Sequence, residues 1–337
     1  MNQSVLKKTL WTAAAAVLLA ALCILVPDGQ ILRAAQDALF TGEELPAFRF
    51  AVQPYGAVLA GGALAAFLIA LWLCRRDVRA WDGIRFFVLS LGFGLLLARA
   101  LYAIAYPGYY NQAWRERLAF LRIQDGGMLM TGAALGMLLA GMIVKPAKKM
   151  ILFAFPAFVC AARIGELFTQ LGYGPAVSFR NFLTRPQTRF TSNLNVSLIE
   201  AAVALALLAV MILRGRKQGL PFLFFLYGSL QVLMESLRRD QHCVWGFVKA
   251  QQVVSIVTAL LCLFIAAGTR KGCLKALALT LPAAGIFLAL EFALDKLDVN
   301  DWILYGVYAA ALAGYIALGL RMFFRKNPQA AERESVP

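Results

Sequence analysis

The stretch PFLFFLYGSLQVLMESLR occupies residues 221–238 and decides the fold class. It is apolar over a length sufficient for a helix to cross a bilayer. Four polar residues interrupt it at steps of four, four and three: Tyr227, Gln231, Glu235 and Arg238. These steps place all four side chains on one helical face. A polar stripe is unstable against lipid, so we expect it to face the protein interior or a polar cavity.

Nine further segments share this apolar composition and are long enough to span a membrane. Hydrophobic residues make up 61% of the 337-residue chain, charged residues only 15%, and the mean hydropathy is +0.70. A soluble domain of this length does not have such a composition. The sequence therefore predicts an all-α, polytopic integral membrane protein with about ten transmembrane helices. Besides 221–238, the predicted spans are 9–27, 55–74, 84–105, 127–144, 149–169, 194–213, 247–267, 275–293 and 302–323.

Basic residues cluster in every second loop and so orient the predicted spans. The formal charge of +15 is compatible with nucleic-acid binding, but this distribution is typical of a topology signal instead. By the positive-inside rule the basic loops are cytoplasmic, which places both chain termini in the cytoplasm. The clusters are Lys7 and Lys8; Arg75, Arg76 and Arg79; Lys145, Lys148 and Lys149; Arg214, Arg216 and Lys217; Arg270, Lys271 and Lys275; and Arg321, Arg325 and Lys326.

Polar and charged side chains inside the spans indicate a functional site, because each is costly in lipid unless it lines a cavity or has a partner. With the spans oriented by their loops, seven such residues fall toward the outer face of the membrane. This convergence predicts a polar site at that end of the helices. The seven residues are Arg99, Asp125, Arg163, Glu166, Tyr227, Glu235 and Arg238.

Arg163 and Glu166 lie one helical turn apart, and two interpretations of this spacing are open. The two side chains either pair with each other, or Arg163 is held for a phosphate group. Arginine suits phosphate because its planar guanidinium donates two parallel charge-assisted hydrogen bonds. Glu235 and Arg238 form a second possible pair.

The ends of two other spans carry weaker signals. Arg99 and Tyr102 share one helical face, where Arg99 either serves the site or extends its charged end to the membrane surface. Asp125 is a candidate N-cap for the helix that follows. Gly126 and Gly127 after it permit close approach of a ligand, and the N–H groups of a helix start attract anions.

Several other site types are excluded by residue types alone. Only Cys243 of the six cysteines lies in a predicted outer loop, so no disulfide framework is available. The single histidine, His242, cannot build a His-cluster metal site, and the carboxylates are too scattered for another metal site. No P-loop, dinucleotide fingerprint or nucleophile elbow is present. No metal or organic cofactor and no nucleic-acid partner are therefore expected.

The motifs along the chain, from about residue 46 to 267, resemble those of bacterial prolipoprotein diacylglyceryl transferases. This family consists of integral inner-membrane enzymes with seven core spans. Seven short motifs match in the family's order and spacing, and together they are more specific than any one alone. The matching segments are 54–56, 98–102, 124–133, 162–166 with Gly174, 191–194 with Glu200, 227–238 and 250–255.

Three positions depart from the family pattern. Thr131 stands where the family has its catalytic histidine, Gln231 where it has an arginine, and Glu166 where it has its signature asparagine. Threonine cannot act as a general base at neutral pH. Glu166, Glu235 or His242 would have to take that role, or the cationic field alone must stabilise a thiolate.

The resemblance implies a reaction at the bacterial plasma membrane. The diacylglyceryl group of phosphatidylglycerol, or of another anionic phospholipid, moves to the lipobox cysteine of a prolipoprotein signal peptide. Catalytic roles are expected for Arg163, Glu166, Thr131, Gln231 and Glu235. Substrate-binding roles are expected for Tyr55, Arg99, Tyr102, Asp125, Gly126, Gly127, Gly174, Ser192, Asn193, Tyr227, Arg238 and Gln252.

The polar residues also suggest how the chain is organised. We expect an N-terminal anchor and outer loop (1–45), a transferase-like core of seven helices (46–268), two additional spans (269–327) and a disordered tail (328–337). Two alternatives to the enzyme remain open. One is a catalytically impaired homologue that binds phospholipid as an accessory protein. The other is a small transporter, although no inverted repeat is evident.

Overall fold

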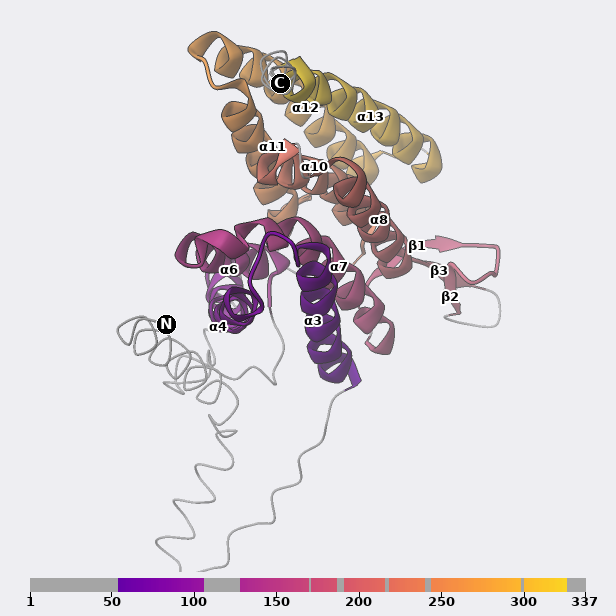
Figure 1. Ribbon diagram of the computed structural model, residues 1–337. Coiled ribbons are helices and arrows are strands. Elements are labelled where there is room, and N and C mark those ends of the chain that lie inside the picture. The colour runs from indigo at the N-terminus through magenta and orange to yellow at the C-terminus, as the bar shows by residue number, and fades with distance from the viewer. Residues whose placement is uncertain are drawn as a thin grey trace, which may run out of the picture. The chain divides into compact units, whose positions relative to one another are not determined.

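The computed structural model describes residues 54–105, 128–169, 171–186, 191–215, 218–239, 244–297 and 300–325. The predicted span 9–27 lies outside these residues. The chain divides into two compact units, Met1–Phe158 and Val159–Pro337. The elements of both units are labelled in Figure 1.

The described residues are mostly helical, which confirms an all-α polytopic membrane protein. Among the described residues, eight helices are long and apolar enough to cross a membrane, and α6 is a shorter apolar helix. Nine of the ten predicted spans therefore coincide with a helix. The helices are α3 (Pro54–Leu73), α4 (Ala80–Ala105), α6 (Met130–Ile143), α7 (Ile151–Gly165), α8 (Val196–Val210), α10 (Leu220–Leu237), α11 (Ala250–Ala267), α12 (Arg270–Lys296) and α13 (Asp301–Arg325).

In the unit Met1–Phe158, α4 and α6 cross at small residues. A Cβ atom added to Gly132 would lie 2.1 Å from the backbone nitrogen of Ala98, and one added to Gly136 would lie 2.3 Å from that of Gly94. Only glycine permits the two backbones to approach this closely, as is common where helices pack within a membrane. A short 3₁₀ helix, η4 (Lys145–Met150), then leads into α7.

The start of α6 differs from the predicted one. The helix begins at Met130, its N-cap is Leu129, and no side chain caps it. The prediction that Asp125 caps this helix is therefore wrong. The reason is a tertiary contact, because Leu129 is extended and its N–H donates to the carbonyl oxygen of Ala98 at 3.2 Å. This bond to α4 fixes the point where the helix starts.

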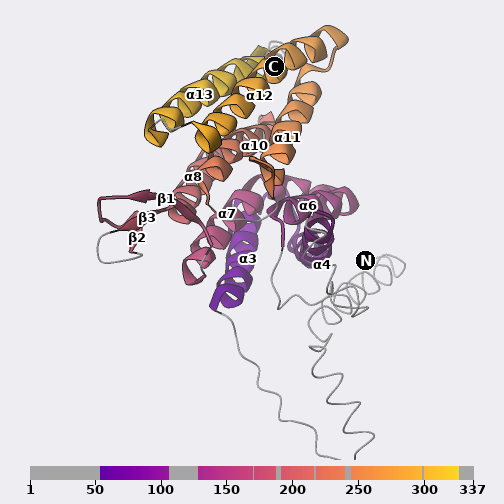
Figure 2. The ribbon, with the colours of Figure 1, turned by 180° about the vertical axis from the view of Figure 1, so that it is seen from behind.

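The unit Val159–Pro337 contains short strands that the sequence did not predict. They form an antiparallel sheet of order β1-β3-β2 and a separate two-stranded hairpin, β4-β5. The larger sheet lies beside the start of α8 in Figures 1 and 2. Strands of two to five residues are too short to show a period-two pattern. They are β1 (Tyr173–Val177), β2 (Thr184–Pro186), β3 (Ser192–Asn195), β4 (Val244–Trp245) and β5 (Val248–Lys249).

The two C-terminal helices pack on the rest of this unit through aromatic rings. Helices α12 and α13 lie side by side in both views (Figures 1 and 2). Phe287 of α12 stacks on Tyr308 of α13 with ring centroids 5.2 Å apart. Phe225 of α10 contacts Tyr315 and Phe323 of α13. Helices α12 and α13 therefore share one compact unit with α10 and α11.

Candidate functional site

Four charged side chains of the unit Val159–Pro337 form a closed ring of ion pairs, here called the ion-pair ring: Arg163, Glu166, Arg238 and Glu200. Arg163 lies 2.5 Å from Glu166 and 2.7 Å from Glu200. Arg238 lies 2.9 Å from Glu166 and 2.6 Å from Glu200. All four residues are at most 7% exposed, so each charge is compensated inside the protein instead of by water.

Separate parts of the chain supply the ion-pair ring. Arg163 is on the last turn of α7, and Glu166 begins the 3₁₀ helix η5 (Glu166–Phe168) directly after it. Glu200 is on α8, and Arg238 is the residue at which α10 ends. The ring thus joins α7, α8 and α10. Its longest-range bond, between Arg238 and Glu166, links residues 72 positions apart.

A serine and a glycine hold Glu166 in place. The hydroxyl of Ser197 donates to Oε2 of Glu166 at 2.6 Å. Gly172 has φ +75°, and a Cβ atom there would lie 1.7 Å from the Ser197 hydroxyl oxygen. Both the backbone angle and the space therefore require glycine. With the two arginines, Ser197 engages both carboxylate oxygens of Glu166.

Gln231 connects the ion-pair ring to a fifth charged group. Its amide nitrogen donates to Glu200 at 3.1 Å and to Glu235 at 2.8 Å. Within the described part of the chain, Glu235 has no ion pair. The polar stripe of α10 therefore points inward as predicted, with Gln231 and Arg238 buried. Arg238, however, pairs with Glu166 and Glu200, while Glu235 accepts from Gln231.

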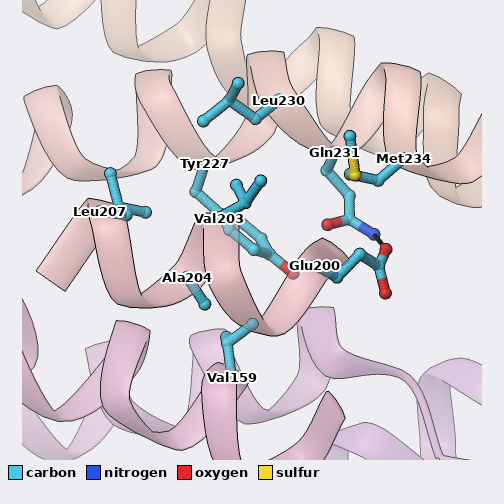
Figure 3. Close-up of a pocket in the computed structure, with 9 residues that line it drawn as sticks. All are labelled: Val159, Glu200, Val203, Ala204, Leu207, Tyr227, Leu230, Gln231 and Met234. Carbon is cyan, nitrogen blue, oxygen red and sulfur yellow. Dashed lines mark hydrogen bonds between the residues drawn. The ribbon is translucent and has the colours of Figure 1, made fainter. Parts of the chain in front are cut away.

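A small pocket of about 10 Å³, with room for about one water molecule, adjoins the ion-pair ring. Figure 3 shows Glu200, Gln231 and the Tyr227 hydroxyl at one end of it and apolar side chains at the other. The pocket therefore combines a polar end with apolar walls. It is lined by Val159, Glu200, Val203, Ala204, Leu207, Tyr227, Leu230, Gln231 and Met234.

Arg185 supports the segment that follows Glu166. Its guanidinium donates to the backbone oxygens of Glu166, Thr169 and Leu171 at 3.0 to 3.3 Å. It also lies over the ring of Tyr173, 5.0 Å from the centroid. Arg185 thereby holds the backbone of this segment through three of its carbonyl oxygens.

The C-terminal end of α10 is held by side chains from two other elements. Lys249 donates to the backbone oxygens of Glu235 and Arg238, and Tyr305 of α13 donates to that of Ser236 at 3.3 Å. These bonds cap orphan carbonyls at the point where α10 presents Arg238. In α11, Gln252 donates to Glu291 of α12 at 2.6 Å. Glu291 thus links α12 to a residue of the last matching motif.

The other predicted site residues lie elsewhere. Tyr55 is on α3, Arg99 and Tyr102 are buried on α4, and Thr131 is on the first turn of α6. All four belong to the unit Met1–Phe158, where the α4–α6 crossing lies next to Arg99. Asp125, Gly126, Gly127 and His242 lie outside the described residues.

The small sheet carries three further predicted site residues. Ser192 and Asn193 are on β3, and each has a buried side-chain oxygen that makes no hydrogen bond in the described structure. Gly174 is on β1, where a Cβ atom would lie 2.7 Å from Val196. Gly174 therefore permits close packing of β1 against the start of α8.

Three residues that the sequence analysis did not select contribute to the site: Glu200, Ser197 and Arg185. Glu200 had a detectable signal, because it is a carboxylate inside a predicted span and matches a family glutamate. Ser197 lies one turn before Glu200 on the same face of α8, a spacing that identifies it only once Glu200 is known. Arg185 lies on β2, outside the predicted spans, and gave no signal.

Taken together, the fold and site define a polytopic helical membrane protein with buried arginine–glutamate pairs beside an apolar pocket. A sequence model of the family named prolipoprotein diacylglyceryl transferase matches residues 45–267. Because the match covers more than half of the chain, the chain belongs to this family.

Proteins named phosphatidylglycerol–prolipoprotein diacylglyceryl transferase are similar to 60–64% of this chain. The protein from Symbiobacterium thermophilum is 26% identical over 241 residues, which cover 63% of this chain and 87% of the relative. The protein from Lactococcus lactis subsp. lactis is 28% identical over 240 residues, covering 64% and 89%. That of Lactococcus lactis subsp. cremoris is 28% identical over 228 residues, covering 60% and 84%.

Proposed function

We propose that this chain is a transferase that moves the diacylglyceryl group of phosphatidylglycerol to the lipobox cysteine thiol of a prolipoprotein. The site works at the outer face of the bacterial plasma membrane, and both termini are cytoplasmic. The family and the names of the relatives support the reaction. The observation that carries the proposal is the meeting of two buried arginines, Arg163 and Arg238, beside an apolar pocket.

In this reaction the thiol sulfur forms a bond to the glyceryl carbon, and the bond from that carbon to the phosphate oxygen breaks. Glycerol phosphate leaves and a thioether remains. Negative charge grows on the leaving phosphate, so fixed cations beside it stabilise the transition state. Arg163 and Arg238 supply that charge in a low-dielectric site, with Arg99 in support.

The thiol proton requires an acceptor, and the geometry ranks the candidate carboxylates. Both oxygens of Glu166 already accept bonds from the arginines and Ser197. Glu235 accepts from Gln231 and has no ion pair among the described residues, so it is the better proton acceptor. Thr131 is assigned a polar contact in place of the family histidine. Substrate contacts are assigned to Tyr55, Tyr102, Asp125, Gly126, Gly127, Gly174, Ser192, Asn193, Tyr227 and Gln252.

The test is expression of this chain in bacteria depleted of their own transferase. Rescue of growth, with diacylglyceryl-modified lipoprotein detected by mass spectrometry, is the expected result. Arg238→Ala should abolish the modification because it removes a buried cation. Arg239→Ala is the matched control, since Arg239 is the next residue, is 47% exposed and pairs with Asp301. Absence of modified lipoprotein with a correctly inserted wild-type chain would refute the proposal.

A second candidate function is a phospholipid-binding accessory protein without turnover. One observation favours it, namely that both arginines of the site are engaged by internal carboxylates. The replacements at Thr131 and Gln231 point in the same direction. This alternative predicts phosphatidylglycerol bound to the purified chain and no modified lipoprotein in the depleted strain.

A further inference from the structure

Glu291 is a carboxylate on α12, a helix that begins after residue 267, where the match to the family ends. A charged side chain within an apolar span is costly unless it has a partner, so its presence is a functional signal. Oε1 of Glu291 accepts a hydrogen bond at 2.6 Å from the amide nitrogen of Gln252 on α11. Gln252 belongs to the last motif that matches the family. A residue outside the matched region therefore contacts a predicted site residue directly.

The bond to Glu291 fixes the orientation of the Gln252 amide. The amide nitrogen also donates to the backbone oxygen of Val232 at 3.4 Å, and the amide oxygen accepts from the backbone N–H of Lys249 at 3.0 Å. Two of these partners need a donor and one needs an acceptor, so all three agree on a single orientation. The bond to the carboxylate is the strongest of the three, because its acceptor is charged in the ionised form. Gln252 is 3% exposed, so water hardly competes for these bonds.

Lys249 extends this restraint to α10. Its backbone N–H is held by Gln252, and its ammonium group donates to the backbone oxygens of Glu235 and Arg238. Glu235 and Arg238 carry the groups assigned to the reaction, a proton acceptor and a cation for the phosphate. A continuous series of hydrogen bonds therefore runs from α12, through the start of α11, to the end of α10.

Helix α13 restrains the same end of α10 independently. The hydroxyl of Tyr305 donates to the backbone oxygen of Ser236 at 3.3 Å, and the Tyr305 side chain is buried with Met234 and Leu237. Both helices that follow the matched region thus act on residues 235–238.

We infer that Glu291 is a positioning residue of the site, which orients the amide of Gln252 and thereby holds the end of α10 in place. As a statement about catalysis this rests on the proposed function. Such a restraint is of consequence, because a displacement of about 1 Å at a reacting group can lower a rate by about 100-fold. The restraint on α10 itself is measurable without turnover.

The first measurement is hydrogen exchange of residues 235–239, followed by mass spectrometry, in the full chain in nanodiscs. The amides of Arg238 and Arg239 both donate to backbone oxygens, so their exchange reports local opening of this segment. Glu291→Leu removes the acceptor and should speed exchange there by about tenfold. Glu291→Gln keeps an acceptor oxygen and should stay within about twofold of the wild-type chain.

The second measurement is turnover of the same variants with phosphatidylglycerol and a lipobox peptide. Because charge grows on the leaving phosphate in the transition state, a displaced Arg238 should lower kcat more than it changes KM. Glu291→Leu should lower kcat by about tenfold with KM within about twofold, and Glu291→Gln should restore most of the kcat. Unchanged exchange of α8 in each variant shows that a lower kcat does not come from global unfolding.

Thr280→Val is the matched control. Thr280 is also on α12, and its hydroxyl shares a buried hydrogen bond with the hydroxyl of Tyr315 on α13 at 3.2 Å. The change removes a polar contact of the same helix about three turns away from Glu291. Exchange of residues 235–239 and kcat should both equal those of the wild-type chain.

Two results would overturn the inference: unchanged exchange of residues 235–239 in folded Glu291→Leu, and an equal acceleration in Thr280→Val. If Glu291→Leu does not fold, Glu291→Asp decides, because it keeps the charge but withdraws the acceptor from Gln252 by one carbon. It should speed exchange by about threefold, and unchanged exchange would again overturn the inference.

The proposed function and this inference fail in different ways. A wild-type chain without turnover, together with faster exchange in Glu291→Leu, would refute the proposed function and leave the restraint on α10 intact. Turnover by the wild-type chain with an unchanged kcat in Glu291→Leu would refute the positioning role alone.

Discussion

The α4–α6 crossing and the ion-pair ring join helices in different ways. At the crossing, Gly132 and Gly136 bring two backbones together, and a Cβ atom at Gly132 would overlap the backbone of Ala98. In the ion-pair ring, charged side chains reach across the space between α7, α8 and α10, at N–O distances of 2.5 to 2.9 Å. The crossing therefore depends on volume, and the ring depends on charge.

The difference indicates which changes each region tolerates. A contact between backbones is insensitive to charge nearby but cannot accept one additional carbon atom. A buried ion-pair network keeps its shape when a group is replaced by an isostere, but loses its balance when one charge is removed. The crossing is suited to a fixed scaffold.

The largest loss of stability is expected from Glu200→Ala. This change leaves two buried arginines sharing one carboxylate, and removing one partner of a buried charge pair costs about 3–5 kcal/mol. Chemical unfolding in detergent should show the loss directly. Glu235→Ala removes the same side chain from a position that has no ion pair with any described residue, and should cost clearly less. Equal losses for the two variants would contradict the role given to the ion-pair ring.

Gly132→Ala should have the second-largest effect and should lower the free energy of unfolding by about 3 kcal/mol. The added carbon would lie 2.1 Å from a backbone atom that cannot rotate away, so α4 and α6 must separate. Gly61→Ala is the matched control, because nothing lies within 4 Å of a Cβ atom there. It should instead stabilise α3 by about 0.5–1 kcal/mol through helix propensity. Thermal unfolding of the two variants should therefore shift in opposite directions.

The sequence predicted these two regions to different extents. The apolar spans and the inward polar stripe of α10 follow from composition and period, and the structure confirms both. The pairing of Arg163 with Glu166, one of two open interpretations, is also observed, because residues one helical turn apart are neighbours. The bonds of Arg238 to Glu166 and Glu200 depend on tertiary packing, and no local pattern contains them. The sequence suggested instead that Arg238 pairs with Glu235, its neighbour along the helix.

The errors and omissions have physical causes as well. The predicted cap at Asp125 was wrong because a tertiary bond from Leu129 to Ala98 sets the start of α6. Ser197 resembles an ordinary serine in an apolar helix until Glu166 is placed beside it. The strands are too short for a periodic signal, so the sheet that precedes α8 was missed.

Ser197→Ala should have a smaller effect on stability than the first two changes. The buried hydroxyl donates to an ionised carboxylate, and such a bond contributes about 1.5–3 kcal/mol. The lower end is expected here, because Glu166 keeps both arginines as partners. Chemical unfolding of Ser197→Ala and of Ser229→Ala gives the comparison, since the Ser229 hydroxyl is equally buried but bonds to a backbone oxygen within its own helix. A larger loss for Ser229→Ala would contradict the importance assigned to the charged acceptor.

The smallest effects are expected at the exposed pair of Arg239 and Asp301, next to the ion-pair ring in sequence but open to solvent. The two charged groups are 3.0 Å apart with side chains 47% and 39% exposed. Surface pairs of this kind contribute about 0–1 kcal/mol and are screened by salt. Asp301 also lies in the first turn of α13, where a negative charge interacts favourably with the helix dipole. Asp301→Ala should therefore lower stability more than Arg239→Ala, and both should lower it by less than about 1 kcal/mol. Unfolding at 1 M salt should reduce the difference.

The outcome that would contradict this prediction is a loss of stability in Arg239→Ala as large as that in Arg238→Ala. Charge at this end of α10 would then matter irrespective of burial, and the distinction between a buried ring and an exposed pair would fail.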